Sequence, residues 1–434
     1  MRTHVTLQKN GCDSNKSLQE WLDWLETLHP QEIELGLDRI REVFKKQSLA
    51  PLARKVIVVA GTNGKGSTIA LLEAMLLSAG YSVGSYTSPH LNYYNERVRI
   101  GGIDVSDDRL CGAFSRVECA RGATSLSYFE FGTLAAFDLF SRHKLDIVLL
   151  EVGLGGRLDA VNIIDADISV ITNIGIDHEE WLGSDREAIG FEKAGVMREQ
   201  RVTIYGERDV PQSIRDAARK RNVLLHILGD EFDFQREAET WQWTSSDGVL
   251  IDSLPPPVLA GECQFTNAAV AIAVVQQLLD FPVDAFDIIE GLETVMCRGR
   301  YEVTEDNSQC IFDVAHNPAS AAALARTLTA QSIMGQTYIV FGVMADKDIA
   351  AMVAELMDVA DKWYLAAPEI PRAAEPAVVE AVCINSGIEI DALQQFASVS
   401  EATEQALRDC AENDRVIVCG SFYTVAEAMR QQLY

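Results

Sequence analysis

The sequence predicts an α/β protein with two doubly wound domains, the first of which carries a phosphate-binding loop. A charge-free, β-branched run at residues 56–60 leads into a glycine-rich turn and then into a helical pattern. Further short apolar runs alternate with helical stretches, which is typical of a parallel sheet covered by helices. The same alternation begins again near Met296. A cleft between two such domains is a natural place for a site that binds several substrates.

Length and composition limit the classes of function. A chain of 434 residues with 48% hydrophobic residues is long enough for two domains with sizeable cores. The formal net charge of −27 opposes binding to nucleic acid through a phosphate-tracking surface. Anionic substrates must therefore be held by local clusters of N–H groups, metal ions, lysine and arginine.

The absence of long apolar runs and the spacing of the cysteines favour a cytoplasmic protein that does not bind a membrane. No apolar run reaches the length of a membrane span, and residues 1–22 lack the apolar core of a secretory signal. The nine cysteines are odd in number and form no close CxxC pair. We therefore expect reduced thiols rather than a disulfide framework or a zinc site.

The first elements lead to the phosphate loop. Residues 17–28 predict an amphipathic helix, and residues 36–44 predict a second one. After the strand at 56–60, the loop reads Gly-Thr-Asn-Gly-Lys-Gly-Ser-Thr over residues 61–68, and a helix is predicted from Ile69 to Ser78. Small residues let backbone N–H groups approach phosphate oxygens, the helix N-terminus adds partial positive charge, and lysine neutralises the phosphates.

This loop departs from the common P-loop pattern. Gly66 separates Lys65 from Ser67, and Val59 stands where that pattern has its first glycine. A purely structural Gly-Lys turn is the alternative, but the strand and helix around it favour a nucleoside triphosphate site.

Candidate metal ligands follow at the ends of predicted strands. The strand at 81–86 runs into a loop with Ser88, which reads either as a metal or phosphate ligand or as a turn serine before proline. The strand at 146–150 ends in Glu151, the arrangement that holds Mg²⁺ beside phosphates, with a solvated glutamate as the alternative.

Two further candidates follow in the chain. The strand at 168–172 leads to His178, a plausible metal ligand, although a loop histidine without such a role is common. The predicted helix at 188–197 carries Lys193 among apolar residues. Partial burial there would lower its pKa and make the neutral amine available, while a surface lysine is the alternative.

The remaining elements are predicted more coarsely. A helix is expected over 132–142, and the weaker pattern at 201–257 suggests a small β excursion that closes the first domain. The other expected helices and strands are helices at 267–279, 284–294 and 319–329, and strands at 310–314, 337–343, 363–366, near 397 and at 416–419.

Taken together, these motifs resemble the Mur ligase superfamily and, within it, the folylpolyglutamate synthase family. The motifs occur in family order along the whole chain, and Gly66 belongs to this family's own loop. They are GTNGKGST (61–68), YTSPHL (86–91), YFEF (128–131), EVGLGGRLDAVN (151–162), DHEEWLG (177–183), EKAGV (192–196), DVAHNP (313–318), ADKDI (345–349) and GSFYTV (420–425).

The resemblance implies an α/β fold with a P-loop-containing, Mur-ligase-like central domain over 1–297 and a Rossmann-like C-terminal domain over 298–434. It also implies an ATP-dependent amide ligase that phosphorylates a carboxylate and lets the amine of L-glutamate attack the acyl phosphate. ATP would be a co-substrate, with two Mg²⁺ ions and a monovalent cation such as K⁺. The other partners would be dihydropteroate and reduced folates, bound by a monomer.

The family motifs also imply roles for individual residues. Lys65, Lys193 and His178 would be catalytic, with Lys193 carbamylated. The ATP contacts would be Thr62, Asn63, Gly64, Lys65, Gly66, Ser67, Asn267, Arg300 and Asp313. The metal ligands would be Ser88, Glu151, His178 and carbamylated Lys193. The pterin contacts would be Glu32, Ile33, Glu34, Leu35, Ser127, Tyr128, Phe129, Glu130, Leu158, Asp159 and Ala160.

Three residues depart from the family motifs, and three other functions are alternatives to the one that the resemblance implies. Cys263 stands where many members have histidine, Arg298 replaces a proline, and Val161 replaces a threonine. The pterin-side motifs are similar to those of the bacterial bifunctional form, which also uses dihydropteroate. A folylpolyglutamate synthase unable to use dihydropteroate, another Mur-type ligase and a P-loop nucleotide switch are the alternatives.

Overall fold

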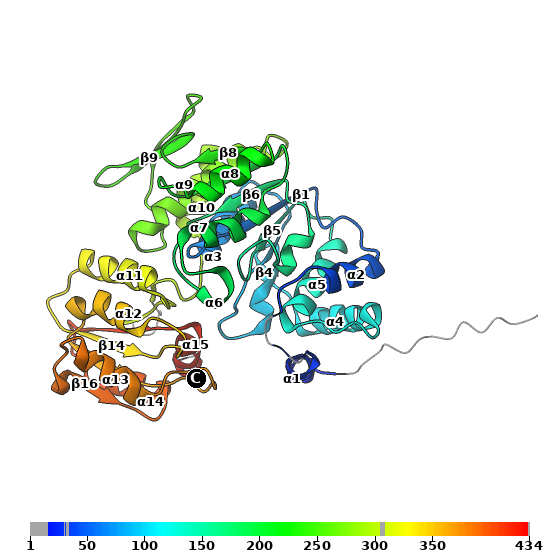
Figure 1. Cartoon of the computed structure of the whole chain (residues 1–434). Coiled ribbons are helices and arrows are strands. Elements are labelled where there is room, and N and C mark those ends of the chain that lie inside the picture. The colour runs from blue at the N-terminus through cyan, green and yellow to red at the C-terminus, as the bar shows by residue number, and fades with distance from the viewer. Residues whose placement is uncertain (1–15, 30, 32–33, 304–308, 433–434) are drawn as a thin grey trace, which may run out of the picture.

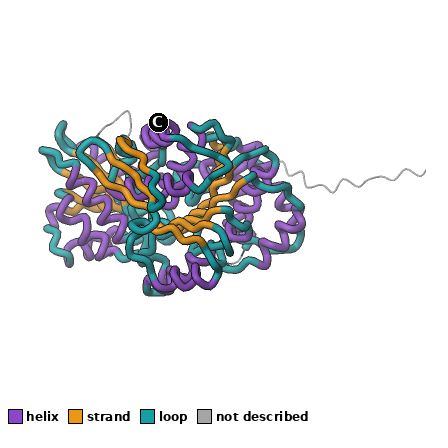
Figure 2. The backbone as a smooth tube through the Cα atoms, turned by 90° about the horizontal axis from the view of Figure 1, so that it is seen from above, coloured by secondary structure: helices purple, strands orange, loops and turns teal. Residues whose placement is uncertain are grey.

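The chain folds into two α/β bodies that lie side by side and are built on separate sheets (Figure 1). The computed structural model describes residues 16–29, 31, 34–303 and 309–432. Seen from above, the strands form two groups, each flanked by helices (Figure 2). The predicted α/β class with two sheets is confirmed.

The first sheet has the order β4-β3-β2-β5-β1-β6-β7-β8, and the strands from β2 to β8 in this order run parallel. The antiparallel strands β3 and β4 form one edge. The strands are β1 (Lys55–Ala60), β2 (Val83–Tyr86), β3 (Val98–Ile100), β4 (Ile103–Asp104), β5 (Ile147–Glu151), β6 (Ile168–Ile171), β7 (Val202–Tyr205) and β8 (Leu224–Ile227).

Strand β1 lies in the middle of this sheet and is buried on both faces. Val56 and Val58 join the core on one face, and Ile57 and Val59 join the core on the other. This is why the strand reads as a continuous apolar run instead of an alternating one.

Different helices cover the two faces of the first sheet. One face is covered by α1 (Leu18–Leu28), α2 (Asp38–Gln47), α4 (Asp107–Arg121), α5 (Tyr128–Ser141), α6 (Glu179–Leu182), α7 (Arg186–Lys193) and α8 (Gln212–Lys220). The other face is covered by α3 (Lys65–Ser78), α9 (Glu262–Gln276), α10 (Ala285–Thr294) and a small antiparallel sheet of β9 (Phe232–Arg236), β10 (Trp241–Ser245) and β11 (Leu250–Leu254).

Several elements differ from the predictions. Residues 201–257 do more than form a β excursion, because β7, α8 and β8 extend the large sheet before the small sheet begins. Helix α5 begins at Tyr128 rather than at 132, since Ser127 and Glu130 form a capping box that starts the helix. Helix α9 begins at Glu262, ahead of the predicted start at 267.

The second sheet has the order β12-β13-β17-β14-β15-β16, with β12 antiparallel at one edge. Helices α11, α12 and α13 pack on one face, and α14 and α15 pack on the other. The elements are β12 (Glu302–Val303), β13 (Cys310–Phe312), α11 (Pro318–Ala330), β14 (Thr337–Phe341), α12 (Ile349–Leu356), β15 (Lys362–Leu365), α13 (Pro376–Asn385), β16 (Leu393–Gln395), α14 (Val399–Asp409), β17 (Arg415–Cys419) and α15 (Phe422–Gln432).

The linker between α10 and β12 contains the predicted domain boundary at 297/298, which stays a prediction. The expectation of reduced thiols holds for the buried Cys383 and Cys419 but is wrong for Cys119, which is disulfide-bonded. No helix in the described part of the chain is long and apolar enough to cross a membrane.

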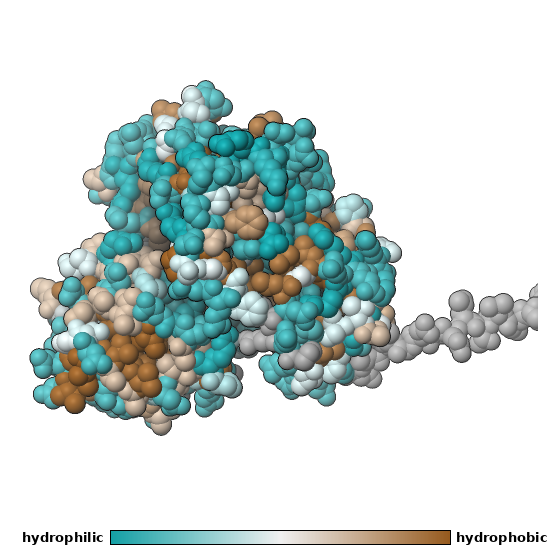
Figure 3. All heavy atoms as spheres, in the orientation of Figure 1, coloured by the Kyte–Doolittle hydropathy of each residue, from teal (hydrophilic) through white to brown (hydrophobic). Residues whose placement is uncertain are grey.

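The surface is mostly hydrophilic on the face shown in Figure 3. An apolar patch interrupts it at the lower left, in the region of α13 and β16 (Figures 1 and 3). Val378 and Ile384 of α13 and Ile390 before β16 are exposed large apolar side chains of this second body.

Candidate active site

Three neighbouring strand ends create the site. In the register of the first sheet, Val59 of β1 lies beside Glu151 of β5, and Ala60 lies beside Ile171 of β6. The segments that follow these parallel strands therefore meet at one edge of the sheet, where open α/β sheets bind ligands. A cavity of about 470 Å³ lies there, lined by the phosphate loop and by residues of the second body.

The segment after β6 holds the phosphate loop in place. Asn173 accepts the N–H of Thr62 at its backbone oxygen at 3.1 Å and the N–H of Asn63 at its side-chain oxygen at 2.9 Å. Gly61 must be glycine, because a Cβ there would lie 1.8 Å from Thr172 Oγ1. These contacts fix the loop before any ligand binds, as preorganised phosphate sites require.

Helix α3 begins directly in the loop. Gly64 is its N-cap residue with φ +82°, and Lys65 is its first residue. The N–H groups of Gly66 and Ser67 thus belong to the first turn, where the helix dipole favours an anion. Gly66 also faces Glu151, whose Oε2 would lie 3.9 Å from a Cβ at this position.

Two lysines converge on the loop. Lys65 Nζ donates to the carbonyl oxygens of Gly61 and Thr62, each at 3.0 Å, and Lys193 Nζ donates to the same Gly61 oxygen at 2.9 Å. Burial lowers the pKa of Lys65, opposed by the charge of Glu151. Burial and then the charge of Lys65 lower the pKa of Lys193 to about 7. A substantial fraction of Lys193 is thus a neutral amine near neutral pH.

The remaining candidate metal ligands line the same cavity. Glu151 is buried, its Oε2 accepts the Ser88 N–H at 3.1 Å, and burial raises its pKa against the opposing charge of Lys65. His178 follows on the neighbouring loop with 41% of its side chain exposed. Loss of solvent around the rest of the ring lowers its pKa to about 4, so the imidazole is neutral. A buried carboxylate, a hydroxyl and a neutral imidazole are groups that can hold Mg²⁺.

The described residues contain no group of three or more His, Cys, Asp or Glu side chains placed to hold a metal ion. The predicted set has one carboxylate and one imidazole. It fits Mg²⁺ because phosphate oxygens, water and a carbamate on Lys193 could complete the coordination, as is usual for Mg²⁺ at nucleotide sites.

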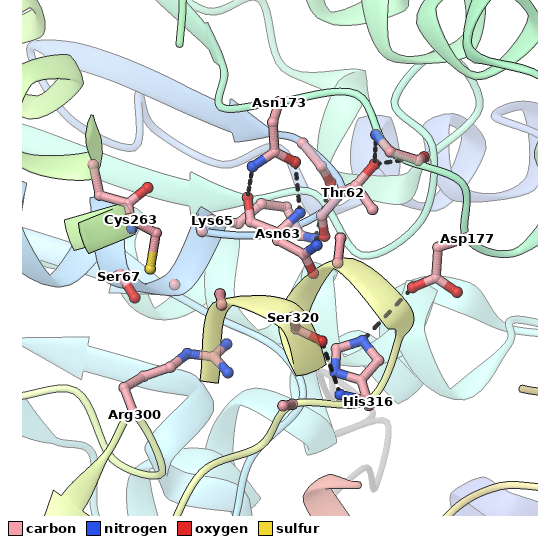
Figure 4. A pocket seen from close by; sticks show the side chains of 18 of the residues that line it. Thr62, Asn63, Lys65, Ser67, Asn173, Asp177, Cys263, Arg300, His316 and Ser320 are labelled. Carbon is pink, nitrogen blue, oxygen red and sulfur yellow. Dashed lines mark hydrogen bonds and ion pairs between the residues drawn. The ribbon is translucent and has the colours of Figure 1, made fainter. Parts of the chain in front are cut away.

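The second body contributes the facing wall (Figure 4). Asp313 accepts the backbone N–H groups of Tyr301 at 3.0 Å and Ala315 at 2.8 Å, and burial raises its pKa against the charge of Arg300. From the first body, Asn267 of α9 also approaches the loop closely, because its side-chain oxygen would lie 2.6 Å from a Cβ on Gly64. The structure thus brings the predicted ATP-binding residues together.

Several residues that line the cavity were not among the predicted site residues. These come from the segment after β6, from the start of α9 and from α11, and are Asn173, Asp177, Gln264, Ala319, Ser320, Ala323, Arg326 and Thr327. Asp177 stands beside His178 in a motif that was recognised, so proximity could have indicated it. The small side chains of α11 carry no such signal.

The described residues of the predicted pterin set are not among those that line this cavity, but Phe129 packs against its wall. The ring of Phe129 stacks on Tyr86 with centroids 6.0 Å apart, and its Cζ would lie 2.7 Å from a Cβ on Gly153, which does line the cavity. Burial raises the pKa of Tyr128 to about 12 and that of Asp159 to about 6. Leu158 and Ala160 flank Asp159 in the same loop.

Other residues of the predicted pterin set have structural partners. Ser127 and Glu130 bond to one another in the capping box of α5, and Arg39 lies 3.3 Å from Glu130. Arg39 also bonds to Glu34, next to Leu35. Glu32 and Ile33 lie outside the described residues.

Each of the two bodies matches a known protein domain family. Residues 59–275 match the Mur ligase middle domain, and residues 299–422 match the Mur ligase, glutamate ligase domain.

Comparisons with individual proteins agree. The chain is 42% identical to the dihydrofolate synthase/folylpolyglutamate synthase of Escherichia coli over 95% of this chain and 94% of that protein. It is 40% identical to the Haemophilus influenzae protein of the same name, covering 94% of this chain and 96% of that protein.

Among solved structures, E. coli FolC in complex with DHPP and ADP superimposes with a TM-score of 0.91 at 41% identity, covering 96% of this chain and 98% of that one. A bifunctional folylpolyglutamate synthase/dihydrofolate synthase with Mn, AMPPNP and L-glutamate bound gives 0.88 at 43% identity, with 97% and 99% covered. The chain therefore belongs to the Mur ligase family, together with the dihydrofolate synthases/folylpolyglutamate synthases that it matches over nearly its whole length.

Proposed function

We propose that this protein is an ATP-dependent ligase that joins L-glutamate to 7,8-dihydropteroate and then adds γ-linked glutamates to reduced folates. The observation that carries this proposal is the composite cavity, in which the phosphate loop and the candidate metal ligands of the first body face Arg300 and Asp313 of the second. The choice of substrates is supported by the relatives named dihydrofolate synthase/folylpolyglutamate synthase. It is also supported by the related structures with DHPP and ADP, or with AMPPNP and L-glutamate, bound.

The reaction would proceed in two steps. A carboxylate oxygen of the pteroate or folate attacks the γ-phosphorus of ATP, the bond to the β-phosphate oxygen breaks, and ADP leaves. The amine of L-glutamate then attacks the carbonyl carbon of the acyl phosphate, loses a proton, and expels inorganic phosphate with the former carboxylate oxygen. Activation is needed because a free carboxylate is a poor electrophile at neutral pH.

The residues of the cavity suit the first step. The N–H groups of the loop and the start of α3 would bind the phosphates, while Lys65 and Arg300 offset the charge that repels an anionic nucleophile. Ser88, Glu151 and His178 would hold Mg²⁺, which supplies Lewis-acid stabilisation of the phosphate oxygens. Lys65 now bonds to loop carbonyls, so phosphate would have to replace these acceptors.

The part of the cavity next to α9 and α11 would hold the base and the ribose of ATP. Asn267, Asp313 and the small side chains of α11 line it beside Cys263. Cys263 offers a thiol where many relatives are expected to offer an imidazole, so its contact with the nucleotide would be weaker than a histidine contact.

The pterin, a second Mg²⁺ and a monovalent cation would bind near the ATP site. The pterin would lie against Tyr128, Phe129 and the 158–160 loop, next to Gly153. A carbamylated Lys193 would carry negative charge and support a second Mg²⁺, and a monovalent cation such as K⁺ would complete the cofactors. The protein would act as a cytoplasmic monomer.

Turnover assays test the function directly. Protein, MgATP and L-glutamate are incubated with dihydropteroate or with a reduced folate, and products are separated by chromatography. We expect dihydrofolate from the first mixture and a lengthened folate from the second. Extension without dihydrofolate formation would identify a monofunctional folylpolyglutamate synthase. Phosphate release independent of both pterins would instead indicate a nucleotide switch.

Replacement of Lys65 tests the phosphate loop. Lys65→Ala should lower kcat at least about 100-fold, because neutralisation of the transferring phosphoryl group is lost. Lys46→Ala is the matched control, since Lys46 forms an exposed ion pair with Glu42 on α2. A Lys65→Ala enzyme with kcat near that of the control would refute the loop assignment.

Lys193 gives a pH-dependent prediction. Because its pKa is lowered to about 7, the amine is mostly protonated at pH 6 and mostly neutral at pH 8, and only the neutral form adds CO₂. In bicarbonate buffer, intact mass measured under mild conditions should show a carbamate whose fraction rises from pH 6 to pH 8. A folded and fully active Lys193→Ala variant would exclude the proposed role.

A further inference from the structure

A buried ion pair joins the two bodies beside the candidate metal site. Asp177 lies in the loop after β6, and its Oδ1 accepts Lys347 Nζ at 2.6 Å, from the loop after β14. Both side chains are nearly buried, with 8% of the aspartate and 10% of the lysine exposed. An ion pair shielded from water is far less screened than a surface pair, and loss of one partner leaves an uncompensated buried charge.

A second polar contact joins the phosphate loop to the same region. The side-chain amides of Asn63 and Asn317 bond reciprocally, at 3.0 and 3.3 Å. The Asn317 amide nitrogen also donates to Asp177 Oδ2 at 3.0 Å. Asn317 is the N-cap residue of α11, so the helix start, the phosphate loop and the Asp177 loop form one network.

The network has a direct connection to the chemistry. Asp177 precedes His178, whose ring lines the cavity, and Asp177 Oδ2 also lies 3.7 Å from His316 Nε2 of the second body (Figure 4). If the second body moved away, Asp177 would lose Lys347, Asn317 and His316 together. Within its own body, Asp177 Oδ1 accepts the backbone N–H of the adjacent His178 at 2.8 Å, and Asp177 Oδ2 lies 4.0 Å from Nε2 of the same residue.

We propose that Asp177, Lys347 and Asn317 are positioning residues that order the His178 loop and the Asn63 side chain when the second body docks. Phosphoryl transfer then depends on docking of the second body, which matches the glutamate ligase domain. Unproductive ATP hydrolysis is thereby limited before the second body is in place. The catalytic half of this inference rests on the proposed function, whereas the docking half does not.

Hydrogen–deuterium exchange tests docking without any turnover. In Lys347→Met, amides of residues 173–183 and 61–64 should exchange at least about tenfold faster than in the parent, while those of β14 stay unchanged. Lys347→Arg should restore most of the protection, because it keeps the charge. Lys362→Met is the control, since Lys362 bonds to the Asp391 oxygen within the second body.

A second variant covers the case in which Lys347→Met misfolds. Asn317→Ser keeps a side-chain oxygen to cap α11, as serine does at N-caps, but removes the amide that reaches Asn63 and Asp177. It should also accelerate exchange in residues 61–64 and 173–183. Unchanged exchange there in both folded variants would overturn the inference.

Kinetics then separate positioning from substrate contact. For Lys347→Met, we expect kcat to fall at least about tenfold, with the Kd for ATP within about threefold of the parent. ATP hydrolysis without an acceptor should fall as well, because phosphoryl transfer itself requires the docked body. If Lys347 only contacts glutamate, the KM for glutamate will rise while exchange at 173–183 stays unchanged, and the positioning role will be refuted. Failure of the proposed function would appear separately, as absence of amide product in the parent enzyme.

Discussion

The site depends on one constraint, the parallel pairing of β1 with β5 and β6 in the middle of a sheet that is buried on both faces. This pairing places Gly61, Glu151 and Thr172 at the same edge, because each follows or ends its strand at that level. Hydrogen bonds from Thr62 and Asn63 to Asn173 then fix the phosphate loop. The loop geometry thus comes from the sheet and requires no bound ligand.

Cationic side chains from both bodies supply the local positive charge of the site. A chain with a net charge of −27 repels anionic substrates in general, so cationic groups must be concentrated where the substrates bind. Lys65, Lys193 and Arg300 all line the cavity. Burial lowers the pKa of both lysines. The nearby charge of Glu151 opposes this shift at Lys65, whereas the charge of Lys65 adds to it at Lys193 and leaves that amine open to modification.

The sequence was sufficient for the parts of the site that are encoded locally. The β-branched run predicted β1, the Gly-Lys turn predicted the phosphate loop, and the acidic residue at a strand end predicted the place of Glu151. The family motifs added Asn267, Arg300 and Asp313, which line the same cavity. Helix α5 begins before the predicted start at 132, because the capping box of Ser127 and Glu130 starts it at Tyr128. The strands β7 and β8 were not predicted, since each has only four residues. The helix α4 was not predicted although it has 15 residues, since few of its side chains are apolar and buried. The Asp177–Lys347 pair joins residues far apart in the chain, and only the packing of the two bodies reveals it.

The central claim is that the cavity activates a carboxylate by transferring phosphate to it. The most direct measurement uses dihydropteroate with ¹⁸O at both carboxylate oxygens, together with MgATP and L-glutamate, and follows the label by mass spectrometry of the released phosphate. Because the bridging oxygen of the acyl phosphate comes from the carboxylate and leaves with phosphorus, one ¹⁸O should appear in each phosphate released during amide formation. Amide formation with unlabelled phosphate would contradict the account.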